Sequence, residues 1–244
     1  GLGSIQPSQT DYFQATRGGG NGDYRVVVLA PANVQELVDL IIEGFDIADQ
    51  YRNPVMILGD GMIGQMMEPV EFKEPKKREL SEKDWATTGT GGDRKPNIIN
   101  SLYLAAEELE KHNIKLQAKY KEIVEKEIKV ESYNIEDADV VIAAYGTTSR
   151  IARTAISELE KEGYKVGLIR PITLWPYPYD EFEKISDKCK GILTVEMNTG
   201  QMVDDVKIAV KGKYPVYFHG RTGGMVPTPD EIITKVKEIY GGEK

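Results

Sequence analysis

Polar, glycine-rich segments that could do chemistry follow several of the apolar runs in this chain of 244 residues. Gly146–Ser149 (sequence GTTS) comes directly after one such run and directly before a helical pattern. Backbone N–H groups at the start of a helix can bind an anion. The segment lacks the glycine spacing and the lysine of phosphate-binding loops. We therefore favour helix capping by its hydroxyls, with anion binding as the alternative.

Polar and charged side chains also follow two later apolar runs. Glu196 and Asn198 lie where a parallel strand is expected to end, the edge at which open parallel sheets bind ligands. They either contact a neighbouring domain or ligand, or cap the helix that follows from Met202. His219 and Arg221 follow the last strand. A lone histidine is more often structural than catalytic, so we favour a structural or interface role for this pair.

A glycine- and methionine-rich loop, residues 59–69, follows the second strand. Its Asp60 and Glu68 carboxylates could act as an acid–base pair, but that work requires a raised pKa in a shielded site. We expect both carboxylates to cap or pair instead. Methionines suit adaptable packing, so an interface function for the loop, through Asp60, Gln65 and Met66, is the main alternative.

The composition excludes several classes of protein. A net charge of −8 argues against nucleic acid or an anionic membrane as the main partner, because both require clustered cations. No segment approaches the ~20 apolar residues that span a bilayer, and no signal peptide is visible, so a cytoplasmic location is expected. Cys189 is the only cysteine, which rules out an internal disulfide or an iron–sulfur cluster held by this chain alone. The two histidines have no metal-ligand spacing, so no metal site is predicted.

The elements that must position these residues alternate between strand and helix, which predicts an α/β protein. Two buried strands, 24–30 and 54–58, flank an amphipathic helix at 34–51 and form a parallel pair. The alternation resumes at residue 138. Strands are predicted at 140–145, 165–170, 191–196 and 216–219, and helices at 151–162, 179–186, 202–210 and 229–240.

The middle of the chain has a different character. Residues 59–96 are charged and rich in proline and glycine, so they are interpreted as a surface connector. Residues 97–129 contain no glycine or proline and carry one apolar stripe, which predicts one long helix or two in succession. We expect this helix to pack on the following domain, with packing on a partner as the alternative. Residues 171–178 are predicted to form a proline-rich loop.

Five segments carry a resemblance to a known family. They are GLGSIQPSQTDYFQATRGGGNGDYRVVVLAPANVQELVDL at residues 1–40, NPVMILGDGMIGQMMEPVEF at 53–72, WATTGTGG at 85–92, IRPITLWPYP at 169–178 and VEMNTGQM at 195–202. The chain resembles the α subunit of thiamine-diphosphate-dependent 2-oxoacid:ferredoxin oxidoreductases, particularly the 2-oxoisovalerate and 2-oxoglutarate types. The resemblance implies CoA-dependent oxidative decarboxylation of a 2-oxoacid, with 2-oxoisovalerate favoured, to an acyl-CoA, CO2 and reduced ferredoxin.

The resemblance also implies a domain organisation. Residues 1–75 correspond to the C-terminal part of a pyrimidine-binding domain and form a partial parallel sheet. Residues 76–134 form the connector and long helix, and residues 135–244 a complete parallel α/β domain similar to the transketolase C-terminal domain. A partial sheet leaves an unpaired strand edge, which is costly unless it is covered.

Cofactors and partners follow from the same resemblance. The β subunit would complete the thiamine diphosphate and Mg2+ sites, and the iron–sulfur clusters would lie on the β or the ferredoxin-like γ subunit, with ferredoxin as acceptor. The family's activating glutamate, substrate-side threonine and carboxylate-binding arginine precede a glycine turn that matches Gly1–Gly3. We therefore expect no catalytic residue in this chain, which would be a fragment and inactive alone. Gly3, Ser8 and Gln9 are the residues expected to line the active site.

Two other classes remain open. A transketolase-like or 2-oxoacid dehydrogenase component would share the second domain and pass acyl groups to lipoamide, but the motif at residues 1–16 argues against it. A non-enzymatic assembly module is favoured by the absence of a nucleophile–base pair and by the methionine loop.

Overall fold

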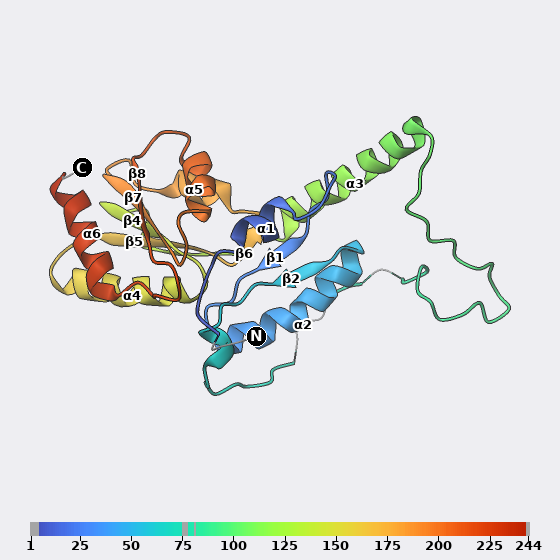
Figure 1. Cartoon of the computed structure of the whole chain (residues 1–244), viewed down its shortest axis with the longest axis horizontal. Coiled ribbons are helices and arrows are strands. Elements are labelled where there is room, and N and C mark those ends of the chain that lie inside the picture. The colour runs from blue at the N-terminus through green and yellow to red at the C-terminus, as the bar shows by residue number, and fades with distance from the viewer. Residues whose placement is uncertain (1–4, 75–77, 81, 243–244) are drawn as a thin grey trace.

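The computed structural model describes residues 5–74, 78–80 and 82–242, which form two β-sheets lying side by side with helices around them (Figure 1). The predicted α/β class is confirmed. Among the described helices, none combines the length and the apolarity required to cross a membrane.

The first sheet is built around β1 (Val27–Leu29), whose three residues are fully buried. β1 pairs in parallel with β2 (Val55–Ile57) through the register Val28↔Met56. The crossover helix α2 (Val34–Tyr51) has the predicted bounds. It begins where Asn33 accepts a hydrogen bond from the Glu36 backbone N–H at 2.8 Å, because this cap satisfies a donor that the helix itself leaves free.

A third strand of this sheet was not predicted. β6 (Thr173–Trp175) lies inside the predicted loop 171–178 and pairs antiparallel with β1. The strand is short and is flanked by prolines, so the sequence pattern resembles a loop. β6 covers one edge of β1, so a later part of the chain supplies the third strand of this sheet.

The second sheet has five strands, and its two faces carry separate cores. The order in space is β3 (Val130–Tyr133), β5 (Val166–Pro171), β4 (Val140–Ala143), β7 (Gly191–Glu196) and β8 (Val216–Gly220). Helices α4 (Gly146–Lys161) and α6 (Pro229–Gly241) cover one face. The other face holds α5 (Met202–Val210), α1 (Tyr12–Arg17) and a 3-10 segment, η2 (Tyr179–Lys184), where an α-helix was predicted.

The antiparallel edge strand β3 was also missed by the sequence analysis. It lies at the end of the region predicted as connector and helix, and it pairs with β5 through Glu131↔Arg170. Two half-buried residues followed by two exposed ones give no strong strand pattern. The remaining four strands are parallel, as predicted.

The long predicted helix is shorter and packs elsewhere. α3 (Ala106–Lys126) begins nine residues later than predicted, and it extends away from the two sheets (Figure 1). Asn100 explains part of this difference, because its side chain accepts a hydrogen bond from the Leu102 N–H at 2.9 Å, a local bond that competes with helix. The buried residues Tyr120 and Ile123 join the core of the first sheet, so the helix packs on the preceding domain and meets the following one at Trp175 of β6.

Candidate functional site

The candidate site lies where the C-terminal ends of β4 and β7 meet. The chain passes from β4 to β5 on one side and later to β7 on the other, so the strand order reverses between β4 and β7. In doubly wound sheets the crevice at such a reversal is the usual ligand site. In this protein the crevice holds a segment of the chain itself, the one that includes Gln9.

Gln9 is 5% exposed and makes hydrogen bonds with both strand ends. Its backbone N–H donates to the Met197 carbonyl at 3.0 Å, and the Met197 N–H donates to its side-chain Oε1 at 2.9 Å. Its Nε2 donates to the Tyr145 carbonyl at 2.9 Å. Its own carbonyl accepts from Asn198 Nδ2 at 2.8 Å. The amide therefore bridges β4 and β7 and has little capacity left for a ligand.

Glu196 and Asn198 divide the two roles that the sequence left open. The Glu196 carboxylate accepts from the backbone N–H groups of Met202 at 2.8 Å and Val203 at 3.0 Å, so it caps α5. Burial raises the pKa of Glu196 above its usual range, although these donors oppose the rise. Asn198 donates to both Glu196 and Gln9, so it joins the strand end to the neighbouring segment.

A small pocket lies beside Gln9, between the two sheets. Ser8, Asp11, Asp60, Tyr145 and Gly146 contribute to its lining. Ser8 is exposed, and its hydroxyl lies 2.9 Å from that of Thr10. Two carboxylates make the pocket unfavourable for an anion. Gly3 lies outside the described residues.

The hydroxyls of Gly146–Ser149 do not cap α4, so that prediction is wrong. α4 begins at Gly146 and has no side-chain cap. The Thr148 hydroxyl donates to the Tyr145 carbonyl at 2.7 Å, and the Ser149 hydroxyl donates to the Gly146 carbonyl at 2.6 Å. Gly146 has a φ of +55°, and a Cβ there would lie 3.4 Å from the Gln9 amide nitrogen. The left-handed backbone conformation therefore favours glycine at this position, whereas the space beside Gln9 would admit a Cβ.

The carboxylates of the methionine loop cap and pair, as expected. Asp60 Oδ1 accepts from the Met62 N–H at 2.8 Å and from the Ile63 N–H at 3.1 Å. Glu68 accepts from the Val34 N–H at 2.9 Å and pairs with Arg150 at 2.8 Å. The Val34 N–H, followed by Arg150, lowers the pKa of Glu68. Glu68 therefore lacks the raised pKa of a general acid.

The other two loop residues and the last strand end make contacts with other parts of the chain. Gln65 Nε2 donates to the Ile5 carbonyl at 3.1 Å, and the Met66 sulfur lies 3.6 Å from an Arg150 guanidinium nitrogen. Arg221 forms an ion pair with Glu231, whose other oxygen accepts from Thr228 in the capping box of α6. These contacts agree with a structural role for Arg221, one of the two roles expected from the sequence. Within the described ranges, no group of three or more His, Cys, Asp or Glu side chains could hold a metal ion.

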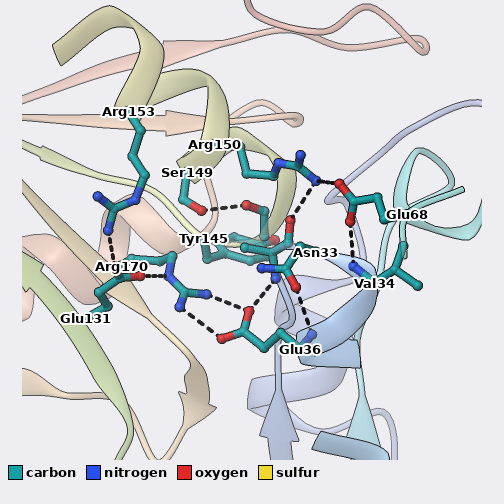
Figure 2. A network of polar contacts seen from close by, with 12 residues as sticks. Asn33, Val34, Glu36, Glu68, Glu131, Tyr145, Ser149, Arg150, Arg153 and Arg170 are labelled. Carbon is teal, nitrogen blue, oxygen red and sulfur yellow. Dashed lines mark hydrogen bonds and ion pairs between the residues drawn. The ribbon is translucent and has the colours of Figure 1, made fainter. Parts of the chain in front are cut away.

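A partly buried ion-pair network that was not predicted from the sequence joins the two sheets. Arg170, at the end of β5, donates to both oxygens of Glu36 on α2, at 2.8 and 2.9 Å (Figure 2). Its Nε donates to Glu131 on β3 at 2.6 Å, and Arg153 also pairs with Glu131. A signal was present, because Arg170 is the only charge in the apolar strand Val166–Pro171.

A second missed cluster joins α1 to α5. The carboxylate of Asp205, which is buried, accepts from the Tyr12 hydroxyl at 2.7 Å and from the Tyr179 hydroxyl at 2.6 Å. Arg17 pairs with the same carboxylate at 3.0 Å. Together with Gln9 and Arg170, this cluster fixes the segment 5–17 and α2 against the second sheet.

Two solved structures align with most of this chain. A 2-oxoglutarate:ferredoxin oxidoreductase from Magnetococcus marinus, with 2-oxoglutarate, coenzyme A and succinyl-CoA bound, aligns with a TM-score of 0.77 at 23% identity, over 96% of this chain and 46% of that chain. A split-gene transketolase, an inactive β4 tetramer, aligns with a TM-score of 0.51 at 14% identity, over 90% of this chain and 58% of that chain. These similarities define the fold.

Sequence comparison defines the family. Residues 2–135 match the model described as "Pyruvate flavodoxin/ferredoxin oxidoreductase, thiamine diphosphate-binding", and residues 138–232 match "Pyruvate:ferredoxin oxidoreductase core domain II". The ketoisovalerate oxidoreductase subunit VorB of Methanothermobacter thermautotrophicus is 43% identical over 99% of this chain and 68% of that protein. The 2-oxoglutarate synthase subunit KorA of Methanocaldococcus jannaschii is 32% identical over 92% of this chain and 66% of that protein. The chain therefore belongs to the family of 2-oxoacid:ferredoxin oxidoreductase subunits.

Proposed function

We propose that this chain is a subunit of a complex that oxidatively decarboxylates a branched-chain 2-oxoacid of the 2-oxoisovalerate type, with CoA as co-substrate and ferredoxin as acceptor. The observation that carries the proposal is the 43% identity to a ketoisovalerate oxidoreductase subunit over 99% of the chain. The proposed partners are the β subunit and a ferredoxin-like γ subunit.

Thiamine diphosphate is the cofactor that the family implies, and the described residues do not fit its diphosphate and metal. The pocket beside Gln9 is lined by the Asp11 and Asp60 carboxylates, which repel a diphosphate. No acidic cluster among the described residues could hold the accompanying cation. The proposed contribution of this chain is therefore one wall of the active site, through the segment that carries Ser8 and Gln9, while the partner subunit supplies the diphosphate and Mg2+ sites.

The two other classes have less support. Transketolase shares the fold with this chain at only 14% identity, whereas the relatives at 30% identity or more are subunits of ketoisovalerate or 2-oxoglutarate enzymes. Family membership also favours a role in an enzyme over an assembly module.

We expect the isolated chain not to bind thiamine diphosphate in isothermal titration calorimetry, since the diphosphate and metal sites lie on the partner. The complex purified with its partner subunits should bind the cofactor with micromolar affinity or better in the presence of Mg2+. Micromolar binding by the chain alone would contradict the proposed division of the site.

A further inference from the structure

We propose that Gln9 is a positioning residue: by filling the crevice between β4 and β7, it fixes the active-site segment at Ser8 to the second sheet. The inference rests on the proposed function, because it assigns this segment to the wall of the active site. With this role for Gln9, the second domain contributes to the reaction by holding the active-site segment in place, without binding a ligand itself.

The first step of the argument is the place that Gln9 occupies. Crevices at a reversal of strand order are open in doubly wound proteins, where they bind ligands. This crevice is closed by Gln9, which is buried and comes from a segment 136 residues away from Tyr145 and 188 residues away from Met197. The chain thus places its own amide where such folds place a ligand.

The second step is the chemistry of the amide. Gln9 Oε1 must accept from the Met197 N–H, and Gln9 Nε2 must donate to the Tyr145 carbonyl. A primary amide carries an acceptor oxygen and a donor nitrogen side by side and has no charge at any ordinary pH. An ionised carboxylate would oppose the Tyr145 carbonyl. An apolar side chain would leave the buried Met197 N–H without this partner and leave the Tyr145 carbonyl with the Thr148 hydroxyl, which is unfavourable.

The third step is the direct connection to the active-site segment. Ser8 precedes Gln9 in the chain, and the backbone of Gln9 is itself held by Met197 and Asn198. A shift of the Gln9 backbone would therefore displace Ser8 by a similar amount. Displacement of a group that contacts the substrate weakens substrate binding, which raises the KM for that substrate.

The test uses the complex with its partner subunits, comparing wild type, Gln9→Met and Gln35→Met with 2-oxoisovalerate, CoA and ferredoxin. Gln35 is a matched control, because its amide also pairs with the backbone of one distant residue, Glu71, but on the outer surface of α2. We expect Gln9→Met to raise the KM for the 2-oxoacid by about tenfold or more and to leave the KM for ferredoxin unchanged. Gln35→Met should match wild type.

A purely structural role would give a different kinetic result. Loss of folded complex reduces the amount of active enzyme, which lowers the apparent kcat and leaves both KM values unchanged. A change in kcat alone, or no change in either constant, would therefore overturn the proposal.

Hydrogen exchange on the same samples tests the anchor without any reference to activity. In Gln9→Met the amides of residues 9–13 and Met197 should exchange faster, whereas those of β4 should keep their protection. Amide exchange rates at residue 9 and Met197 that match those of wild type would overturn the proposal, whether or not the complex turns over. An inactive wild-type complex with these exchange differences would instead contradict the proposed function and leave the anchor supported.

Gln9→Glu supplies a second variant if the methionine variant fails to fold. A protonated carboxyl can accept from Met197 and donate to Tyr145 as the amide does, whereas the ionised form cannot. We expect the 2-oxoacid KM of Gln9→Glu to approach that of wild type as the pH is lowered, with each pH compared to wild type at the same pH. A ratio that does not change with pH would count against the role of the amide.

Discussion

Replacing Arg170 with methionine is expected to lower the free energy of unfolding by about 3–5 kcal/mol, as measured by urea denaturation. The Arg170 side chain is 8% exposed and binds both oxygens of Glu36, which belongs to the other sheet's crossover helix. Removing Arg170 takes the cation from the Glu36 carboxylate, whose side chain is 18% exposed and which keeps the Ala32 N–H as a donor at 2.6 Å. Breaking a largely buried ion pair in this way costs about 3–5 kcal/mol.

Arg153→Met is the matched control for this prediction. Arg153 pairs with Glu131, which also binds Arg170, but the Arg153 side chain is 39% exposed. Exposed ion pairs contribute about 0–1 kcal/mol, so this variant should remain within about 1 kcal/mol of wild type. Equal losses of unfolding free energy in the two variants would mean that burial of the Glu36–Arg170 pair does not determine the contribution of this pair to stability.

The second large effect is expected at alkaline pH. Burial raises the pKa values of Tyr12, Tyr145 and Tyr177 well above the ordinary value of 10.0, and nearby charges, including those of Asp205 and Glu196, add to the rise. The unfolded chain releases these protons near pH 10, whereas the folded chain retains them. Stability is therefore lost as the pH rises above about 10, by about 1.4 kcal/mol per pH unit for each tyrosine. Urea denaturation at a series of pH values measures this slope.

Tyr177→Phe tests the origin of that slope. The Tyr177 hydroxyl is buried and has no hydrogen-bond partner among the residues that the structure describes, so its removal breaks no bond there. We expect stability at neutral pH to be retained and the alkaline slope to fall by about 1.4 kcal/mol per pH unit. A slope identical to that of wild type would show that this buried phenol does not control the alkaline transition.

Residue patterns predicted those elements that local sequence determines. α2 and α5 have the predicted bounds, because their apolar residues follow helical spacing over the whole element. The pattern failed for β3 and β6, which are short strands whose pairing with β5 and β1 decides their structure. It also failed at the start of α3, where a local asparagine bond competes with helix.

The candidate site was predicted only in part, for a related reason. Glu196 and Asn198 were identified because strand ends mark such sites, and the sequence left their two roles open. The burial of Gln9 depends on strands more than 130 residues later in the chain, so no local sequence pattern predicts it. The capping prediction for Thr148 and Ser149 failed because their hydroxyls bond to carbonyls of their own turn.

The most direct test of the proposed function is ferredoxin reduction by the complex purified with its partner subunits and supplied with thiamine diphosphate and Mg2+. We predict that 2-oxoisovalerate supports reduction only when CoA is present, with isobutyryl-CoA and CO2 formed in equal amounts. A 2-oxoacid that differs by one or two methylenes should react about 10- to 200-fold less well, the range that an apolar pocket allows. Reduction without CoA, or no reduction with any 2-oxoacid, would contradict the function proposed for this chain.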